Sequence, residues 1–310
     1  MKSKYKNIIV IICSLFFLVN LIIYRNIVFD TVGFSINIWI SSLLPAIFPF
    51  FFFFDILINY NAIKYFPKVI RNIFRYLFNI NDECFIIFLL SMLSGFPSNA
   101  RNIKNMYLSK KITKEEGEHL LYFTHFSNPM FILGTIPIIL NNNRIGIYIL
   151  VVHYLANIIL GICLRSYNNV SNISKFSNKK ESKNFGFILT TSIKKSLDSV
   201  LGILGTLIVF LIVSNLLINF FNLGNTSSLL VKSILELTSG LKELSKYNLS
   251  DKLLLIISSC ILSFGGLSVH MQVINELVDT DISYNNYFIG RILQVVISFI
   301  ISYLIGLFAF

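Results

Sequence analysis

The sequence predicts an all-α integral membrane protein with inverted structural repeats and two re-entrant or broken helical hairpins. Three observations support this fold. Of the 310 residues, 55% are apolar and only 13% are charged, about half the charged share of a soluble domain. The charged residues lie between long apolar runs, and two shorter apolar runs end at glycines. A chain of this length can hold about six to eight crossings.

The net charge of +11 does not by itself indicate nucleic-acid binding. Basic loops are expected of any multi-pass membrane protein, and the chain has no zinc-finger, helix-turn-helix or RNA-binding motif. We interpret the cysteines as packing residues rather than disulfides or metal ligands, because no Cys-x-x-Cys pair occurs. They are Cys13, Cys84, Cys163 and Cys260.

The first apolar run, near 8–24, follows three lysines and carries no small-x-small cleavage signal. We therefore expect residues 1–30 to form an uncleaved signal-anchor span with a cytoplasmic N-terminus. The other long apolar runs lie near 34–58, 119–140, 145–164, 199–221 and 287–310.

Amphipathic and polar stretches separate these runs. The stretch 63–78 predicts an interfacial helix whose basic face meets anionic headgroups, because apolar and basic residues each recur at helical spacing. Its basic residues are Lys64, Lys68, Arg71 and Arg75. The stretch 185–201 repeats this pattern. Residues 166–184 are rich in Asn, Ser and Lys, which predicts a cytoplasmic linker between a first repeat with its linking span (31–165) and a second repeat (185–310).

A single shift along the chain relates the two halves in sequence. The shift that places Gly95 on Gly265 also places the span 119–140 on 289–310. The short runs 84–96 and 252–266, too short to cross comfortably as helices, then correspond to each other. If both are re-entrant, the linking span at 145–164 turns the second half over, as in transporters with inverted repeats.

The distribution of basic residues agrees with this topology. It places 19 Lys and Arg residues on the cytoplasmic side and five outside. The cytoplasmic segments are 1–7, 60–82, 97–117 and 165–198, and the outer segments are 25–33, 141–144, 223–250 and 267–286. The loop with Lys104 and Lys110 is thus expected inside, and the loop with Glu276, Asp279 and Asp281 outside.

The strongest local motif is Phe126-Ser127-Asn128-Pro129, which interrupts an apolar run. Proline is favoured at the first helical position, and Ser127 or Asn128 can cap that helix. A half-helix that begins inside the membrane presents free N–H groups and a positive dipole end to a polar or anionic ligand. An ordinary proline kink, satisfied by neighbouring helices, stays open as the alternative.

The segment Gly95-Phe96-Pro97-Ser98-Asn99 predicts a hairpin tip. Glycine permits the tight reversal, Pro97 stops the incoming helix, and Ser98 or Asn99 can cap the outgoing one. The partner tip is Gly265-Gly266 with Ser268. Two such tips meeting near the midplane would line a cavity; the alternative is a turn at the membrane surface.

Isolated polar residues inside apolar runs are costly and often functional. Glu236 is the better candidate for binding a cation or proton, whereas Asp55 is expected at the membrane interface. His153 and Asn157, one turn apart, favour packing hydrogen bonds. Gly146 and Gly161, near the ends of the linking span, need no break and are expected to tolerate a larger residue.

The sequence offers no catalytic constellation. It has no HExxH, GxSxG, P-loop or GxGxxG before a helix, so we expect no enzyme activity, no cofactor and no metal. Residues 113–116, Thr-Lys-Glu-Glu, predict a capping box that starts a helix.

These motifs resemble the sporulation integral membrane protein family of the YlbJ type, in the nucleoside-recognition (Gate) group. The segments that carry the resemblance are 93–101, 113–118, 126–132 and 263–273, and it covers about residues 30–310. Asn99 stands where relatives usually have glycine, and His270 where glutamine is more usual. The resemblance implies a role in spore formation in a Gram-positive bacterium, with no settled substrate.

We therefore expect a multi-pass protein of the bacterial cytoplasmic membrane that passes or gates a small polar solute. The alternative is a non-transporting component needed for assembly of the spore envelope, cortex or coat. The expected partners are the lipid bilayer and an unidentified small polar solute, with no nucleic acid; a homo-oligomer stays open. The candidate substrate-binding residues are Gly95, Pro97, Ser98, Asn99, Ser127, Asn128, Pro129, Glu236, Gly265, Gly266, Ser268 and Gln272.

Overall fold

All regular structure in the described part of the chain is helical. The computed structural model describes residues 2–60, 62–165 and 184–310, and no strand occurs in them. The first elements are α1 (Lys2–Ile23), α2 (Arg25–Ile38), η1 (Trp39–Leu43), α3 (Leu44–Asn59), η2 (Ala62–Tyr65), α4 (Lys68–Phe78), α5 (Asp82–Ser94), α6 (Ser98–Leu108), α7 (Lys114–Phe123), η3 (Phe131–Thr135), α8 (Ile136–Leu140) and α9 (Ile145–Cys163). The remaining elements are α10 (Phe185–Phe220), α11 (Asn225–Leu235), α12 (Leu237–Leu244), α13 (Asp251–Phe264), α14 (Gly266–Leu277) and α15 (Asn285–Ala309).

The prediction of a multi-pass, all-helical membrane protein is confirmed. Six helices in the described residues are long and apolar enough to cross a membrane: Tyr5–Ile23, Arg25–Asn59, Ile145–Cys163, Phe185–Phe220, Asp251–Leu277 and Asn285–Ala309. A seventh results if α4 and α5, which are bent by 90°, count as one span. The division into repeats and linker stays a prediction, and the linker falls almost wholly on 166–183, outside the described residues.

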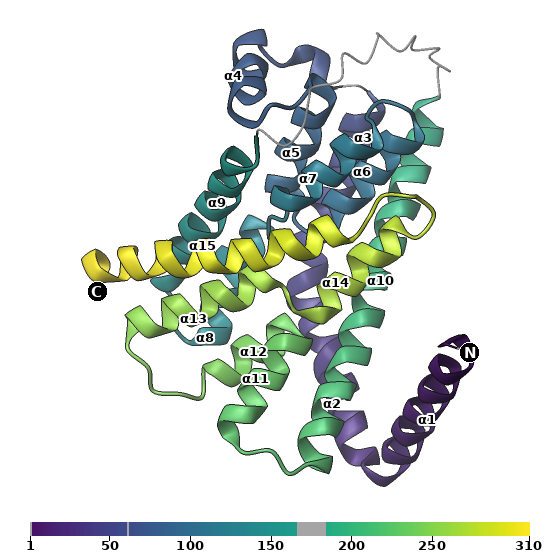
Figure 1. The fold of residues 1–310 in the computed structure, drawn as a ribbon, viewed down its shortest axis with the longest axis vertical. Helices are drawn as coiled ribbons and strands as arrows, with labels where there is room; N and C mark the ends of the chain where they lie inside the picture. Colours follow the sequence, from purple (N-terminus) through teal and green to yellow (C-terminus); the bar gives the residue numbers. More distant parts are fainter. Residues whose placement is uncertain (1, 61, 166–183) are drawn as a thin grey trace.

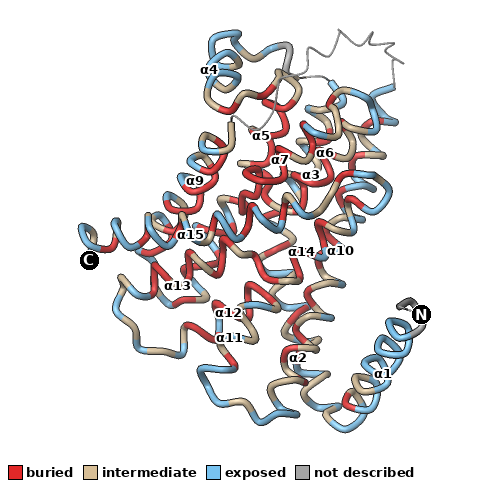
Figure 2. The backbone as a smooth tube through the Cα atoms, in the orientation of Figure 1, coloured by how far each residue is buried: buried red, intermediate tan, exposed pale blue. Residues whose placement is uncertain are grey.

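The two longest spans begin earlier than their apolar runs. Residues 25–33, expected as an outer loop, form the start of α2, and the amphipathic stretch 185–201 is the first part of α10. Helix α1 stands apart from the other helices (Figure 1), and its surface is almost entirely exposed (Figure 2). In a membrane this apolar surface contacts lipid.

The predicted interfacial helix is α4, which lies across the start of α5. The ring of Phe78 packs on that of Phe88, with centroids 4.8 Å apart. Arg71 Nη1 lies 2.8 Å from Asp82 Oδ2 at the first turn of α5. The basic face expected to meet headgroups is therefore partly neutralised within the protein.

The predicted capping box at the start of α7 is confirmed. Glu116 N donates to Thr113 Oγ1 at 3.2 Å, and Thr113 N donates to Glu116 Oε2 at 2.9 Å. Asn81, the N-cap of α5, donates to Glu116 Oε1 at 2.6 Å. The same carboxylate thus fixes the starts of two helices beside each other.

The two short apolar runs differ in structure. The first, α5, ends at Gly95 and the chain turns into α6. The second, α13, continues through Gly265 into α14, and together they form the candidate span Asp251–Leu277. The second run is therefore a broken span and not a re-entrant hairpin, because apolar side chains continue past the glycines. The hairpin of the second half is α11–α12, which turns at Glu236.

This difference changes the offset between the halves. The offset that places Gly95 on Gly265 pairs the broken segment 119–140 with α15, which is unbroken. A shorter offset, which places Ile145 at the start of α9 on Asn285 at the start of α15, pairs like elements. It also pairs the α5–α6 turn with the α11–α12 turn, and the break after α7 with the break after α13.

The loop 278–284 lies on the same side of the protein as α6, and not on the opposite side as predicted. Lys104 Nζ is 2.7 Å from Asp279 Oδ2. Tyr107 Oη donates to Asp281 Oδ1 at 2.6 Å, and this bond lowers the pKa of Asp281. The correction agrees with α13 and α14 forming one candidate span, Asp251–Leu277, rather than a hairpin. Residues 267–286 contain no Lys or Arg, so the balance of basic residues is the same in either place.

The buried apolar side chains form two clusters, and the break after α7 lies between them. Phe126 belongs to the cluster around α4, α5 and α7. Phe131, a short way further along the chain, belongs to the cluster around α3, α8, α10 and α13. The interruption thus lies in the interior, where its backbone cannot reach water.

We expect single cysteines at Lys110 and Asp279 to react with a membrane-impermeant thiol reagent from the same side of membrane vesicles. Both residues are exposed, and the Lys104–Asp279 ion pair holds their loops together. Arg144 is exposed and directly precedes the start of α9. A cysteine there is the control, and it should react only from the side opposite to Lys110 and Asp279. The background protein should lack the four native cysteines. Labelling of Asp279→Cys and Arg144→Cys from one common side would contradict this topology.

Candidate functional site

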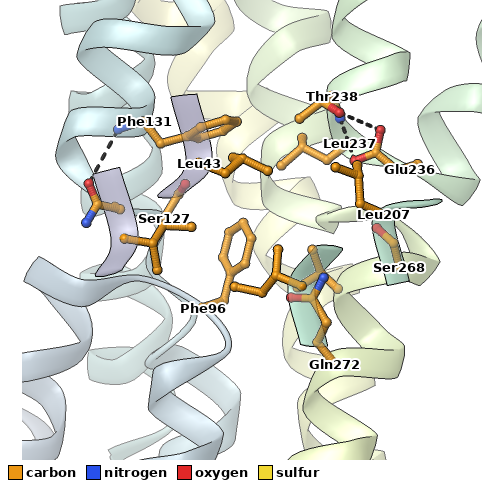
Figure 3. A pocket seen from close by; sticks show the side chains of 14 residues that line it. Leu43, Phe96, Ser127, Phe131, Leu207, Glu236, Leu237, Thr238, Ser268 and Gln272 are labelled. Atoms are coloured by element: carbon orange, nitrogen blue, oxygen red, sulfur yellow. Dashed lines mark hydrogen bonds between the residues drawn. The ribbon is translucent and has the colours of Figure 1, made fainter. Parts of the chain in front are cut away.

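Four helix interruptions line one inner cavity of about 40 Å³. Phe96 comes from the α5–α6 turn, Asn128 from the break after α7, Glu236 from the α11–α12 turn, and Ser268 from the first turn of α14. Figure 3 shows these elements around the cavity. Leu43 beside α3 and apolar residues of α10 complete the wall. Both halves of the chain therefore contribute to a single site.

Asn128 caps the half-helix that resumes at Pro129. Its Oδ1 accepts from Met130 N at 2.8 Å and from Phe131 N at 3.4 Å. Its Nδ2 donates to Leu93 O, at the end of α5, at 3.0 Å. The side chain thus satisfies a helix start and a helix end inside the membrane, and it links the first break to the α5–α6 turn.

Glu236 is the capping residue of the α11–α12 hairpin. It is only 3% exposed, in extended conformation between α11 and α12. Its carboxylate accepts from Thr238 N at 2.9 Å, Ser239 N at 2.7 Å and Thr238 Oγ1 at 2.6 Å. A negative charge at the start of α12 is stabilised by the helix dipole. The carboxylate therefore has three donors within the protein.

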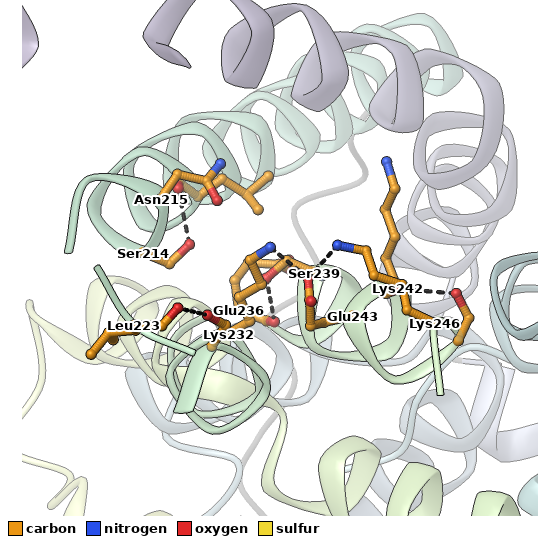
Figure 4. A network of polar contacts seen from close by, with 12 residues as sticks. Ser214, Asn215, Leu223, Lys232, Glu236, Ser239, Lys242, Glu243 and Lys246 are labelled. Atoms are coloured by element: carbon orange, nitrogen blue, oxygen red, sulfur yellow. Dashed lines mark hydrogen bonds and ion pairs between the residues drawn. The ribbon is translucent and has the colours of Figure 1, made fainter. Parts of the chain in front are cut away.

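An ion network holds the two arms of this hairpin side by side (Figure 4). Glu243 Oε2 on α12 lies 2.7 Å from Lys232 Nζ on α11 and 2.9 Å from Lys246 Nζ. Glu243 and Lys232 are both largely shielded from solvent. The Lys232–Glu243 ion pair fixes the position of Glu236 between the two helices, because Lys232 lies one helical turn before Glu236.

Two glycines with positive φ allow the interruptions to touch. A Cβ on Gly95 (φ +79°) would lie 2.5 Å from Asn128 N. A Cβ on Gly266 (φ +73°) would lie 3.0 Å from Leu237 N and 3.2 Å from Glu236 Cα. In the first half, Gly95 of the α5–α6 turn therefore packs on Asn128, the cap in the break after α7. In the second half, Gly266 of the break after α13 packs on Glu236, the cap in the α11–α12 turn.

Side chains of α9 and α15 satisfy the backbone of the first break. Ser127 N donates to His153 Nε2 at 3.0 Å, and Asn157 Nδ2 donates to His125 O at 2.9 Å. Arg291 donates to Tyr122 O near the end of α7 at 2.8 Å. These bonds replace the backbone hydrogen bonds that are lost where the helix is interrupted inside the membrane. The packing role expected for His153 and Asn157 agrees with this arrangement.

A second cavity of about 270 Å³ forms a vestibule beside the first. Its charged lining residues are Arg101, Lys195, Asp198 and Glu276. Ile203 and Gln272 line both cavities, and Gln272 Nε2 donates to Thr206 Oγ1 at 2.9 Å. The vestibule lies toward the end of α14, on the side of loop 278–284. Ile203 and Gln272 therefore lie between the two spaces.

The twelve residues expected at a site separate into three groups. Five line the inner cavity: Ser127, Asn128, Glu236, Ser268 and Gln272. Pro97 lines the vestibule, together with Gln272. The others belong to neither lining: Gly95, Ser98, Asn99, Pro129, Gly265 and Gly266. Asp55 belongs to neither lining; it is 6% exposed, and its Oδ2 accepts from Ser192 Oγ at 2.7 Å.

Sequence reasoning missed the apolar wall and the buried arginine. Ile203 and Leu207 of α10 line the cavity, but nothing in an apolar run distinguishes a cavity wall from a lipid-facing surface. Arg291 was detectable, because a charged residue inside an apolar run is costly and commonly functional. In the described residues, no group of three His, Cys, Asp or Glu side chains could hold a metal ion.

Two comparisons with known proteins bear on this site. Residues 40–143 match a family model described as nucleoside recognition (Gate). The chain is 26% identical to the sporulation integral membrane protein YlbJ of Bacillus subtilis (strain 168), over 94% of this chain and 81% of that protein. No solved structure matches the chain. The predicted resemblance is therefore confirmed. The Gate match contains the α5–α6 turn and the break after α7, but ends before the second half.

We expect Gly95→Ala to lower the thermal unfolding midpoint in detergent more than Gly134→Ala does. At Gly95 the new Cβ meets a backbone nitrogen, and a side chain at φ +79° with ψ 179° costs about 1–3 kcal/mol. Gly134 has no atom within 4 Å of such a Cβ and is the matched control. Gly146 and Gly161 are unsuitable controls, contrary to expectation, because a Cβ there would lie 2.7 Å from Pro137 and from Phe78. Equal midpoints for the two variants would show that the turn at Gly95 is not constrained.

Proposed function

We propose that this multi-pass membrane protein passes or gates a small polar solute through the inner cavity. The main support is the meeting of four interrupted helices around one space. The offset that places Ile145 on Asn285 also places Phe96 on Glu236 and Asn128 on Ser268. All four of these lining residues surround the cavity. Secondary transporters build their substrate sites from discontinuous helices at the interface of two repeats.

The same offset supports inverted repeats. It places His125 on Gly265, and a Cβ on Gly265 would lie 3.3 Å from the His125 ring. Equivalent residues touch each other only near a symmetry axis. Helix α9 supplies the odd crossing between the halves, so we propose a two-fold axis in the membrane plane close to this contact.

The polar groups of the cavity favour a neutral solute with hydroxyl or amide groups. Ser127, Asn128, Ser268 and Gln272 can each donate and accept hydrogen bonds. The Glu236 carboxylate disfavours an anion by direct repulsion. The rings of Phe96 and Phe131 provide apolar surface against which a flat solute can stack.

The size of the cavity implies that solute entry requires a rearrangement. A volume of about 40 Å³ is far below the roughly 300 Å³ of a typical small-molecule site. The vestibule is larger, at about 270 Å³, and it shares the lining residues Ile203 and Gln272 with the inner cavity. We propose that α14 moves against α10, breaks the Gln272–Thr206 hydrogen bond and joins the two spaces.

We further propose that the protein acts in spore formation, in a bacterial cytoplasmic membrane with the N-terminus and vestibule facing the cytoplasm. The name of the Bacillus relative supports the first part, and the excess of Lys and Arg on the vestibule side supports the second. The alternative is a non-transporting component of spore envelope assembly. It is favoured by the same name, which states sporulation and membrane location but no solute. The absence of enzyme activity stays a prediction.

We expect purified protein in liposomes to exchange at least one of three labelled solutes, namely uridine, glucose or glycerol. Asn128→Leu should reduce that flux about tenfold, because it removes a helix cap and a polar group of the cavity. Ser302→Ala is the control, since this buried hydroxyl donates only within α15, to Phe299 O at 3.0 Å. Folded protein that neither transports nor is stabilised by any of the three would favour the non-transporting alternative.

A further inference from the structure

Arg291 is a fully buried arginine in the middle of the protein. It lies on α15, inside the candidate span Asn285–Ala309, with 0% exposure. None of the ion pairs formed by the described residues includes it. A guanidinium stays protonated in proteins, and a charge in this position needs specific stabilisation. The surroundings of Arg291 therefore have to provide that stabilisation without a carboxylate.

The end of α7 provides it. Arg291 Nη2 donates to Tyr122 O at 2.8 Å, and Tyr122 is the last residue but one of α7. The carbonyls at a helix C-terminus carry a partial negative charge. Arg291 Nη1 also donates to Gln294 Oε1, and the guanidinium carbon lies 5.1 Å from the ring centre of Tyr287. The charge thus faces a helix dipole, an amide oxygen and an aromatic face.

The residue before Arg291 shows that α15 is built for this contact. A Cβ on Gly290 would lie 2.4 Å from Tyr122 O, a distance that real side chains do not reach. Glycine at this position therefore allows α15 to approach the end of α7. The same helix end continues into residues 124–128, which place Ser127 and Asn128 on the cavity wall.

We propose that Arg291 is a built-in cation that neutralises the C-terminal end of α7 and so positions Ser127 and Asn128 at the cavity. In secondary transporters, half-helix C-termini at the substrate site commonly coordinate a coupling cation. Here a side chain of the protein occupies that role, so this helix end requires no ion from solution. This inference rests on the proposed function for its significance, but the contact can be tested without any solute.

The test uses Ser127→Cys as a reporter in protein without the four native cysteines. The rate of reaction with 2-aminoethyl methanethiosulfonate measures how accessible the break is. Arg291→Met should raise this rate about tenfold, because the uncapped end of α7 frays. Arg291→Lys, which keeps the charge, should restore most of the protection. Ser302→Ala on the same helix is the control and should leave the rate unchanged.

Two further measurements keep the proposal open to refutation. Gly290→Ala retains the arginine but pushes α15 from Tyr122, so it should raise the rate as Arg291→Met does. The rate in protein with Arg291 should be equal in NaCl, KCl and choline chloride, because no dissolved cation is needed. Protection that depends on one of these cations would overturn the proposal. An unchanged labelling rate in Arg291→Met would also overturn it. So would equal labelling rates, or equal amounts of protein in the membrane, for Arg291→Lys and Arg291→Met.

Discussion

The need to give each free backbone group a hydrogen-bond partner inside the membrane is the constraint on which this structure depends. The break after α7 exposes carbonyl and N–H groups where neither water nor helix geometry can satisfy them. His153, Asn157 and Arg291 supply the partners, and they come from α9 and α15. Those two helices are therefore held against α7 by polar bonds as well as by packing. The position of the cavity wall follows from the same bonds, because the satisfied segment is the one that carries Ser127 and Asn128.

Each half caps one of its half-helices with a buried side chain, but the two caps lie at different kinds of interruption, the break after α7 and the α11–α12 turn. In the first half an amide, Asn128, caps the half-helix, and its cap is packed by a glycine from the neighbouring turn. In the second half a carboxylate, Glu236, does so, again packed by a glycine. The two caps differ in chemistry, since one is an amide and the other a carboxyl group. The solute that we propose for this cavity would thus meet an amide on one side and a carboxylate on the other.

The inner cavity combines parts that differ in their capacity to move. Its polar groups lie on short half-helices, and much of its apolar wall comes from α3 and α10, which are long and continuous. Short helices joined by turns can shift as units, since few backbone hydrogen bonds connect them to the rest. The small inner cavity and the larger vestibule are consistent with one such unit, α14, resting against α10. The proposed passage of a solute and the architecture of broken helices thus depend on the same feature.

The sequence by itself determined the membrane character, the breaks at Gly95, Asn128 and Gly265, and the cap at Asn128, because composition, proline, glycine and Asn128 act locally. It did not predict the turn at Glu236, and the cap expected from Ser98 or Asn99 was wrong, because α6 begins after Pro97 without a side-chain cap. It did not determine which interruptions meet, since Gly95 can be aligned with Gly265, or Phe96 with Glu236, and both offsets match plausible elements in a chain of apolar runs. Nor could charge place the loop 278–284, which has no Lys or Arg. Only the tertiary structure decided these points. Whether α13 continues across the membrane, and which carbonyl Arg291 reaches, depends on contacts between residues far apart in sequence. Such contacts leave no local pattern in one sequence.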